Sequence, residues 1–419
     1  MAACAFATVR VGQFGAAGPG FVESPFPALF TSRGPPAFLG GVKIALVTET
    51  FPPEINGVAM TFGVLARELA ALGHHVTVYR PRRPEESGGA GSNPFLQQPM
   101  PGMPLPGYPG LRMGLPAGGR LRRLWQSERP DLVHVVTEGP LGASAVGAAL
   151  ALSIPVTSSF HTNFHTYAGH YGWKAMQGMV LAWLRRLHNR TARTFVPTLE
   201  LCGQLERVGF RNLGLLSRGV DTEKFNPSHR CTDLRRSWGA GPQTCVVLHV
   251  GRLAPEKNYP LLWEAYRRMH AANADCRFVL VGEGPLRAAV SETQPHCVFQ
   301  GAVPHGDIGR YYASADVYIH ASQTETFGNV VLEGLSSGLA FAGFGYAAAL
   351  QFVTDGKNGL LLPCDQPERL LEAAVRLVRD HRLRDQLRES ARSAVLAHTW
   401  GAVARTFARQ LGAVVDAAG

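Results

Sequence analysis

Apolar, strand-like runs alternate with amphipathic helical patterns along most of this chain, and this alternation narrowly limits how the chain can fold. The first cycle begins with an apolar run at residues 43–48. A loop and a helix follow, and the apolar residues of the helix recur every three or four positions: Val58, Phe62, Leu65, Leu69 and Leu72. Repeated strand-helix units of this kind predict an α/β protein with a parallel sheet covered by helices on both faces.

The alternation occurs in two blocks. Further strands of the first block are expected at 75–79, 131–136, 155–160 and 193–196, and a Pro- and Gly-rich surface loop at 81–119. Strands of the second block are expected at 245–250, 277–281, 298–300, 316–320 and 339–343. Two such blocks predict two doubly wound, Rossmann-like domains that face each other across a cleft, with ligands at the carboxyl ends of the strands.

The domain boundaries follow from these blocks. We expect an N-terminal domain at 43–215, a C-terminal domain at 216–397, and a last helix at 398–419 that packs back on the N-terminal domain. Residues 1–42 are rich in Gly, Pro, Ala and Ser and contain one acidic residue, Glu23. This composition predicts a disordered extension.

Charge and cysteine content indicate the compartment and the partners. Residues 1–211 contain 19 lysines and arginines against 11 acidic residues, in a chain of net charge +10. A basic first half is suited to an anionic membrane surface, whereas no nucleic-acid recognition motif is present. The 7 cysteines are widely spaced, which predicts free thiols in the cytoplasm. No segment offers about 20 consecutive apolar residues, so no membrane span is expected.

Two cations follow the first strand of the second block. Arg252 and Lys257 lie five residues apart in the loop after residues 245–250. Cations at the carboxyl end of a strand can clamp a diphosphate and neutralise the charge that grows on a leaving nucleotide. Taken alone, this pattern fits an ordinary basic loop better than a diphosphate site.

Two glutamates surround a Thr-Phe-Gly-Asn turn further along. Glu325 precedes a helix expected to begin near Gly328, and Glu333 lies in its second turn. The N–H groups at such a helix start favour anions. Carboxylates accept hydrogen bonds from sugar and ribose hydroxyls. The segment therefore predicts a site for a sugar attached to a phosphate.

The first block contributes its own candidates. Gly57, in the loop after the first strand, lets the backbone approach a ligand closely. His161 stands at the end of a buried strand, although a single histidine is more often structural than catalytic. The following run of His165, Tyr167 and His170 is interpreted as an acceptor surface or a packed loop, because it lacks the acidic partner that a metal site would need.

These segments resemble the family 4 retaining glycosyltransferases, which have the GT-B fold. The resemblance rests on Glu325-x7-Glu333, on the loop at 251–257 and on Val-Gly-Glu-Gly-Pro at 281–285, and it covers the chain from about residue 43 to its end. It implies that Arg252 and Lys257 bind the donor pyrophosphate. It implies further that Glu325 holds the donor sugar and Glu333 the ribose.

The same resemblance extends to the rest of the donor site. It implies that His161 faces the donor sugar, that the loop at Val303 receives the base, and that the turn supplies Phe327, Gly328, Asn329 and Val330. The catalytic set is then His161, Glu325, Arg252 and Lys257. The resemblance implies neither a metal nor a cofactor. The N-terminal domain would be the acceptor side and the C-terminal domain the donor side.

The expected function is retaining transfer of a hexose from a nucleoside diphosphate sugar to a hydroxyl of a lipid or saccharide. The segment at 338–349 is similar to GDP-mannose-dependent α-mannosyltransferases, which favours mannose. Two alternatives stay open: a UDP-sugar-dependent glucosyl or sulfoquinovosyl transferase acting on diacylglycerol, and a non-catalytic nucleotide-sugar-binding protein. The expected location is the cytoplasm, with peripheral contact on the inner face of the membrane.

Overall fold

The computed structural model describes residues 41–54, 56–83, 93–105, 112–161, 174–288 and 297–419. Its first sheet contains seven parallel strands in the order β3-β2-β1-β6-β7-β8-β9. The strands are β1 (Lys43–Val47), β2 (His75–Pro81), β3 (Leu96–Met100), β6 (Leu132–Val135), β7 (Val156–Ser159), β8 (Arg193–Val196) and β9 (Leu213–Leu215).

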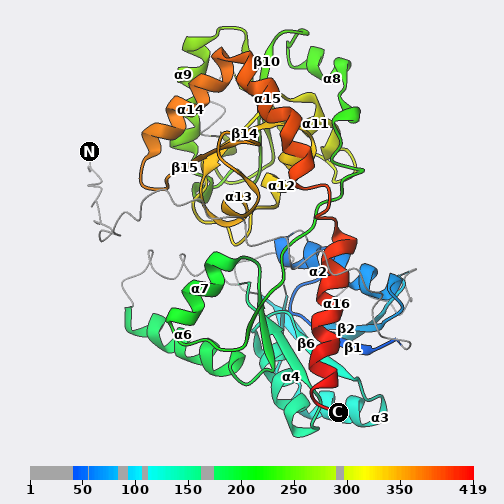
Figure 1. Ribbon diagram of the computed structural model, residues 1–419. Helices are drawn as coiled ribbons and strands as arrows, with labels where there is room; N and C mark the ends of the chain where they lie inside the picture. The colour runs from blue at the N-terminus through cyan, green and yellow to red at the C-terminus, as the bar shows by residue number, and fades with distance from the viewer. Residues whose placement is uncertain (1–40, 55, 84–92, 106–111, 162–173, 289–296) are drawn as a thin grey trace. The chain divides into compact units, whose positions relative to one another are not determined.

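Helices cover both faces of this sheet because its strands are apolar on both sides. In β1, Ile44 and Leu46 pack toward α2 (Gly57–Ala71) and α16 (Trp400–Asp416), the C-terminal helix drawn in red in Figure 1. Ala45 and Val47 pack on the other face with α3 (Gly118–Ser127) and α4 (Pro140–Ala151). Two more helices, α6 (Lys174–His188) and α7 (Leu199–Arg207), enclose a smaller cluster around Phe160.

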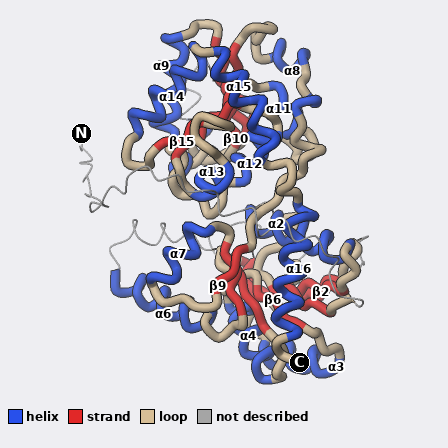
Figure 2. Tube along the Cα trace, in the orientation of Figure 1, coloured by secondary structure: helices blue, strands red, loops and turns tan. Residues whose placement is uncertain are grey.

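The second sheet contains six parallel strands in the order β12-β11-β10-β13-β14-β15. They are β10 (Cys245–Val250), β11 (Cys276–Val281), β12 (Val298–Gly301), β13 (Val317–His320), β14 (Ala340–Phe344) and β15 (Leu360–Leu362). One face packs on α9 (Tyr259–Ala272), α14 (Pro367–Arg379) and α15 (His381–Ala391). The other packs on α11 (Ile308–Ser314), α12 (Asn329–Ser336) and α13 (Ala347–Phe352). Figure 2 shows these helices around the strands. The two doubly wound sheets confirm the predicted α/β class.

Each sheet has one point at which the strand order reverses. In the first sheet β1 lies between β2 and β6, and in the second β10 lies between β11 and β13. Loops that leave neighbouring strands at such a point diverge to opposite faces and open a crevice at the carboxyl edge. The loops after β10 and β13 contain Arg252, Lys257 and Glu325. The topology therefore brings these residues to the same edge of the sheet.

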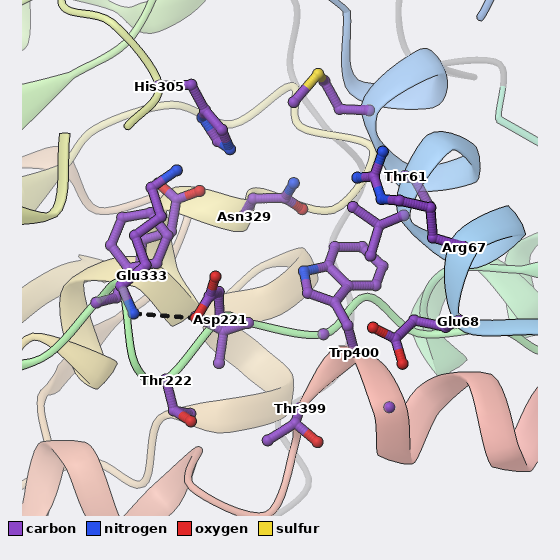
Figure 3. Close-up of a pocket in the computed structure, with 17 residues that line it drawn as sticks. Thr61, Arg67, Glu68, Asp221, Thr222, His305, Asn329, Glu333, Thr399 and Trp400 are labelled. Carbon is purple, nitrogen blue, oxygen red and sulfur yellow. Dashed lines mark hydrogen bonds between the residues drawn. The ribbon is translucent and has the colours of Figure 1, made fainter. Parts of the chain in front are cut away.

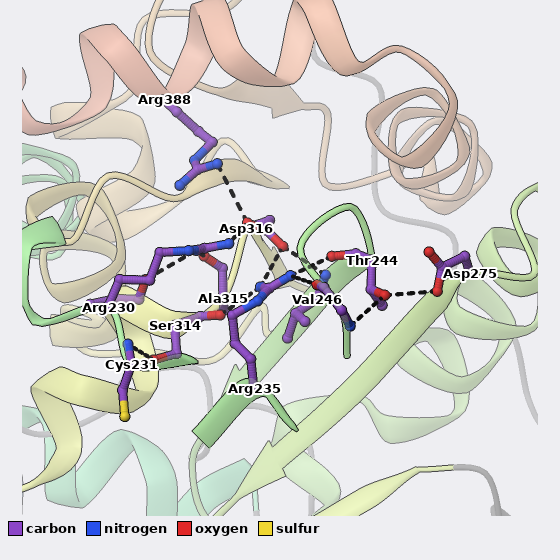
Figure 4. Close-up of polar contacts among 12 residues, drawn as sticks. Arg230, Cys231, Arg235, Thr244, Val246, Asp275, Ser314, Ala315, Asp316 and Arg388 are labelled. Atoms are coloured by element: carbon purple, nitrogen blue, oxygen red, sulfur yellow. Dashed lines mark hydrogen bonds and ion pairs between the residues drawn. The ribbon is translucent and has the colours of Figure 1, made fainter. Parts of the chain in front are cut away.

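A buried carboxylate fastens the opposite end of β13. Asp316 accepts hydrogen bonds from Arg230 at 2.8 Å, from Arg235 at 3.0 Å and from the backbone N–H of Val246 at 2.9 Å, and Arg388 lies 3.4 Å away (Figure 4). Burial alone would raise the pKa of Asp316, but these cations lower it below its ordinary value. The network ties α8 (Thr232–Ser237) and α15 to the sheet.

One sequence-based prediction was wrong in its extent. The segment at 81–119 is not a single loop, because it contains β3, the antiparallel hairpin of β4 (Gly102–Pro104) and β5 (Arg112–Gly114), and the start of α3. The sequence of β3, Leu-Gln-Gln-Pro-Met, lacks an apolar run.

The predicted domain boundaries remain predictions. Three short 3-10 helices complete the described elements: η1 (Pro227–His229), η2 (Pro255–Lys257) and η3 (Arg392–Ala394).

Candidate functional site

The loop after β10 makes a tight turn that presents Lys257. Gly282, at φ +138°, approaches so closely that a Cβ there would lie 1.9 Å from the carbonyl oxygen of Gly251. The loop closes through η2, and Asn258 adopts the left-handed conformation at φ 55° before α9 begins. The side chain of Lys257 is only 17% exposed, whereas that of Arg252 is exposed to solvent. The loop therefore holds one predicted cation firmly and leaves the other accessible.

The loop after β13 is bonded directly to the loop after β10. The hydroxyls of Ser322 and Thr324 each donate to the carbonyl of Glu256 at 3.2 Å. Lys257 forms an ion pair with the carboxylate of Glu325, which is 18% exposed. These contacts bring together the predicted phosphate cation and the predicted sugar carboxylate.

The charge of Glu325 depends on its neighbours. Burial alone would raise the pKa of this carboxyl, but Lys257 and His320 lower it below its ordinary value. His320, at the end of β13, is itself buried, and burial lowers its pKa to about 4. Glu325 is thus an anion at neutral pH beside a cation and a neutral imidazole. That arrangement suits hydrogen bonding to hydroxyl groups.

The Gly328 turn starts α12 as the sequence predicts. Gly328 has φ +89°, a conformation that side chains disfavour. Phe327 is buried in the core and Val330 packs against it, so these two residues can offer a ligand their backbone rather than their side chains. The Oδ1 atom of Asn329 is buried and has no partner among the described residues. It is therefore available to a ligand.

Glu333 lies one further turn along α12 and borders a pocket of about 550 Å³ (Figure 3). Its Oε2 accepts a hydrogen bond of 2.7 Å from the hydroxyl of Tyr312. Burial raises the pKa of Glu333, while Tyr312 and the nearby Lys224 oppose that rise. Asn329 and His305 also line the pocket. The predicted ribose carboxylate therefore faces a cavity.

Val303 lies in the same loop as His305, between β12 and α11, and it is half-buried against the core. Burial lowers the pKa of His305, and Lys224 lowers it further. The imidazole is therefore neutral at pH 7. Residues of α2 and of the start of α16 also line the pocket, among them Arg67 and Trp400.

Gly57 begins α2. Asn56 caps this helix by accepting a hydrogen bond of 2.9 Å from the N–H of Ala59. The guanidinium of Arg218 donates to the carbonyl of Gly57 at 3.3 Å, and a Cβ at Gly57 would lie 3.1 Å from that Nη1 atom. Glycine at this position therefore admits close approach, here by an arginine that sequence reasoning did not select.

His161 follows β7, as predicted. The residue is half-buried, its ring lies edge to face with that of Phe62 at 5.4 Å between ring centres, and both ring nitrogens are buried without a partner among the described residues. Burial and the charge of Arg218 keep the pKa of His161 well below its ordinary value. The neutral ring can thus donate one hydrogen bond and accept another. His165, Tyr167 and His170 lie outside the described residues.

Sequence reasoning missed Tyr312, Lys224 and Arg218. Tyr312 belongs to the apolar side of α11, so its sequence pattern is that of a core residue. Lys224 and Arg218 lie in the segment between the blocks, where the sequence favours a solvated surface for any cation. Within the ranges that the structure describes, no group of three or more His, Cys, Asp and Glu side chains could hold a metal ion.

Comparison with known proteins gives matches over both sheets. A family model described as Glycosyltransferase Family 4 matches residues 55–224, and one described as Glycosyl transferases group 1 matches residues 232–394. The chain is 33% identical over 366 residues to a GDP-mannose-dependent alpha-mannosyltransferase of Mycobacterium tuberculosis, which covers 87% of this chain and 94% of that protein.

Two further proteins extend the comparison. The chain is 30% identical over 376 residues to the sulfoquinovosyl transferase SQD2 of Arabidopsis thaliana, covering 86% of this chain and 71% of the relative. Its fold is similar to that of sucrose-phosphate synthase from Thermosynechococcus elongatus, with a TM-score of 0.72, 19% identity, and coverage of 90% of this chain and 99% of that one. The structural likeness concerns the fold alone.

Proposed function

Because this chain belongs to glycosyltransferase family 4, as its motifs predicted, we propose that it transfers mannose from GDP-mannose to a hydroxyl of a lipid or saccharide acceptor, with retention of configuration. The observation that supports this proposal best is the direct contact between Lys257 and Glu325. It joins the loops after β10 and β13 where the strand order reverses. A phosphate-binding cation and a hydroxyl-binding carboxylate there fit the two halves of a sugar phosphate.

The donor is expected to run across this edge of the sheet. Lys257 and the exposed Arg252 neutralise the diphosphate, while Glu325 accepts hydrogen bonds from the sugar hydroxyls. Glu333 holds the ribose beside the pocket, and the backbone at Val303 meets the base. The N–H groups at the start of α12 add partial positive charge. Because two cations and a helix start supply this charge, the proposed reaction uses no metal ion.

The charges at the proposed site support a route to the proposed retention that forms no covalent intermediate. Glu325 is paired with Lys257 and serves to orient the sugar rather than to attack it. We therefore propose a front-face departure of the diphosphate without a covalent sugar-enzyme intermediate. We propose that His161, kept neutral by the burial of its ring, hydrogen-bonds the sugar without repelling a positively charged transition state. The acceptor oxygen then attacks from the side that the diphosphate leaves.

The acceptor side is proposed to touch an anionic membrane through α6. Met179 is 66% exposed and Trp183 is 47% exposed, and Arg186 follows them on the same helical face. An apolar stripe bordered by cations suits the interface of a bilayer with anionic lipids. Of the helices that the structure describes, none has both the length and the apolar composition to cross a membrane. The location that we propose, from the exposed face of α6, is the inner face of the cytoplasmic membrane.

The 30% identity to a sulfoquinovosyl transferase favours a second candidate, a UDP-sugar-dependent transfer to diacylglycerol. One experiment separates the two. Purified protein is incubated with GDP-mannose, UDP-glucose or UDP-sulfoquinovose, each with diacylglycerol, a glycolipid or a saccharide, and products are identified by mass spectrometry. The proposal expects an α-mannoside from GDP-mannose, with the anomer assigned by NMR. A UDP-sugar product would support the second candidate, and binding without turnover would indicate a sensor.

A further inference from the structure

Arg218 is a buried cation whose hydrogen-bonding capacity is largely unused. Its side chain is 6% exposed, and Nη1 donates to the carbonyl of Gly57 at 3.3 Å. Among the described residues, the buried Nε atom has no hydrogen-bond partner and no carboxylate lies within ion-pair distance of the guanidinium. A buried charge that lacks a partner is costly to a folded protein. Such a cost is tolerated at sites where the charge meets a ligand.

The neighbours of Arg218 come from several separate parts of the proposed donor site. Its guanidinium lies 5.8 Å from the ring centre of Phe327, in the turn before α12. Glu325 and His161 are close enough to interact with it electrostatically. Arg218 therefore lies toward the sugar end of the proposed site rather than beside Glu333, where the ribose is expected.

The backbone on both sides of Arg218 is firmly held. The hydroxyl of Ser217 lies 3.1 Å from Nε2 of His398, and the N–H of Val220 donates to the carbonyl of His398 at 3.0 Å. A Cβ at Gly219 would lie 2.5 Å from the backbone nitrogen of Trp400, so the two segments are in close contact. A side chain on such a support is positioned before any ligand arrives, which lowers the cost of binding.

From this geometry we propose that Arg218 is a third cation of the donor site and that it binds the β-phosphate. The inference rests on the proposed function. As the bond between the sugar C1 and the β-phosphate oxygen breaks, the acceptor oxygen forms the new bond to C1 and its proton passes to the departing phosphate. The diphosphate gains negative charge in this step. A guanidinium with free N–H groups stabilises that charge more in the transition state than in the ground state.

The test uses Arg218→Met, which keeps the length of the side chain and removes its charge. Arg211→Met is the matched control, because Arg211 is exposed and its side chain forms no hydrogen bond or ion pair among the described residues. Calorimetry measures GDP, GMP, UDP and UMP binding, and steady-state assays measure transfer. We expect Arg218→Met to weaken diphosphate binding about 10-fold relative to monophosphate binding. Its kcat should fall about 100-fold, and the control should match the wild type.

A folded Arg218→Met protein with unchanged kcat and an unchanged preference for the diphosphate would overturn the inference. If Arg218→Met does not fold, Arg218→Lys decides: a lower kcat together with a reduced preference for the diphosphate supports the role, and wild-type values for both overturn it. A wild-type protein that neither binds nor turns over any nucleotide sugar refutes the proposed function, and this inference with it. When the wild type does turn over a donor, the behaviour of the Arg218 variants alone decides whether this side chain binds the β-phosphate.

Discussion

Lys257 and Glu325 form an ion pair between the loops after β10 and β13, so a cation expected at the diphosphate directly contacts a carboxylate expected at the sugar. The contact fixes the spacing of the two groups on either side of the bond that is proposed to break. It also makes the ionisation of each group depend on the other. Substitution of either residue should therefore change the chemistry of the pair as well as the affinity for the donor.

Lys257→Met should shift the pH dependence of transfer. In the wild type, Lys257 and His320 hold the pKa of Glu325 below its ordinary value against the opposing effect of burial. Without the cation, burial dominates and that pKa rises, so the acid limb of kcat/KM moves to higher pH. At pH 7 the loss of phosphate stabilisation should lower kcat/KM about 100-fold or more. If the acid limb of kcat/KM stayed at the wild-type pH, Lys257 would not control the ionisation of Glu325.

Tyr312→Phe should weaken binding of the donor through the ribose. It removes the 2.7 Å hydrogen bond that orients Glu333, and a carboxylate that is no longer held in place should bind the ribose roughly 10-fold more weakly. Isothermal titration with GDP and with its 2′,3′-dideoxy analogue measures the effect. The variant should lose affinity for GDP but not for the analogue. Tyr311→Phe, a neighbouring change with no described hydroxyl bond, is the control. Equal losses for both ligands would contradict the assignment of Glu333 to ribose.

Asp316→Asn should destabilise the fold in a pH-dependent way. The cations around Asp316 lower its pKa in the folded protein, so the stabilisation is present above the unfolded-state pKa of about 4. It is lost as the pH falls through the folded-state value. Urea unfolding at pH 7 should show a loss of about 3 kcal/mol, with exposed Asp365→Asn as the control. The difference in unfolding free energy between wild type and variant should shrink toward pH 3. A difference in unfolding free energy that stays constant with pH would show that the charge of Asp316 does not cause the destabilisation.

Trp183→Ala combined with Arg186→Glu should reduce binding to vesicles. The two changes remove an exposed apolar anchor and reverse one charge on α6. Affinity for vesicles rich in phosphatidylglycerol at low salt should fall about 10-fold or more. Arg382→Glu makes the same charge reversal on an exposed position of α15 and serves as the control. Equal binding by all three proteins in a sedimentation assay would exclude this face as the contact.

The regular part of the fold was predictable because its strands are apolar on both faces. β8 and β10 have the bounds expected from the sequence, since buried parallel strands form continuous apolar runs. β3, β9 and β15 were not predicted. They lie at the edges of their sheets, where short or partly polar sequences suffice, and only pairing with a neighbour reveals them.

The candidate site was predictable where motifs carry its chemistry. Lys257 and Glu325 stand in recognisable loops and Glu333 in the helix that follows, and the structure brings Lys257 and Glu325 into contact. Arg218 could not be found in this way, because nothing in a segment between two domains indicates that its cation is buried. Tyr312 could not be found from the sequence either, because its hydroxyl matters only through its hydrogen bond to Glu333, and that bond depends on how α11 packs against α12.

Turnover of the donor by Glu325→Ala and Lys257→Ala, measured beside the wild type with an accepted acceptor, tests most directly whether the loops after β10 and β13 form the donor site. We expect the wild type to transfer the sugar. Each variant should remain folded while its kcat/KM falls at least about 100-fold. Turnover at the wild-type rate in both variants would contradict the assignment of the donor site to the loops after β10 and β13.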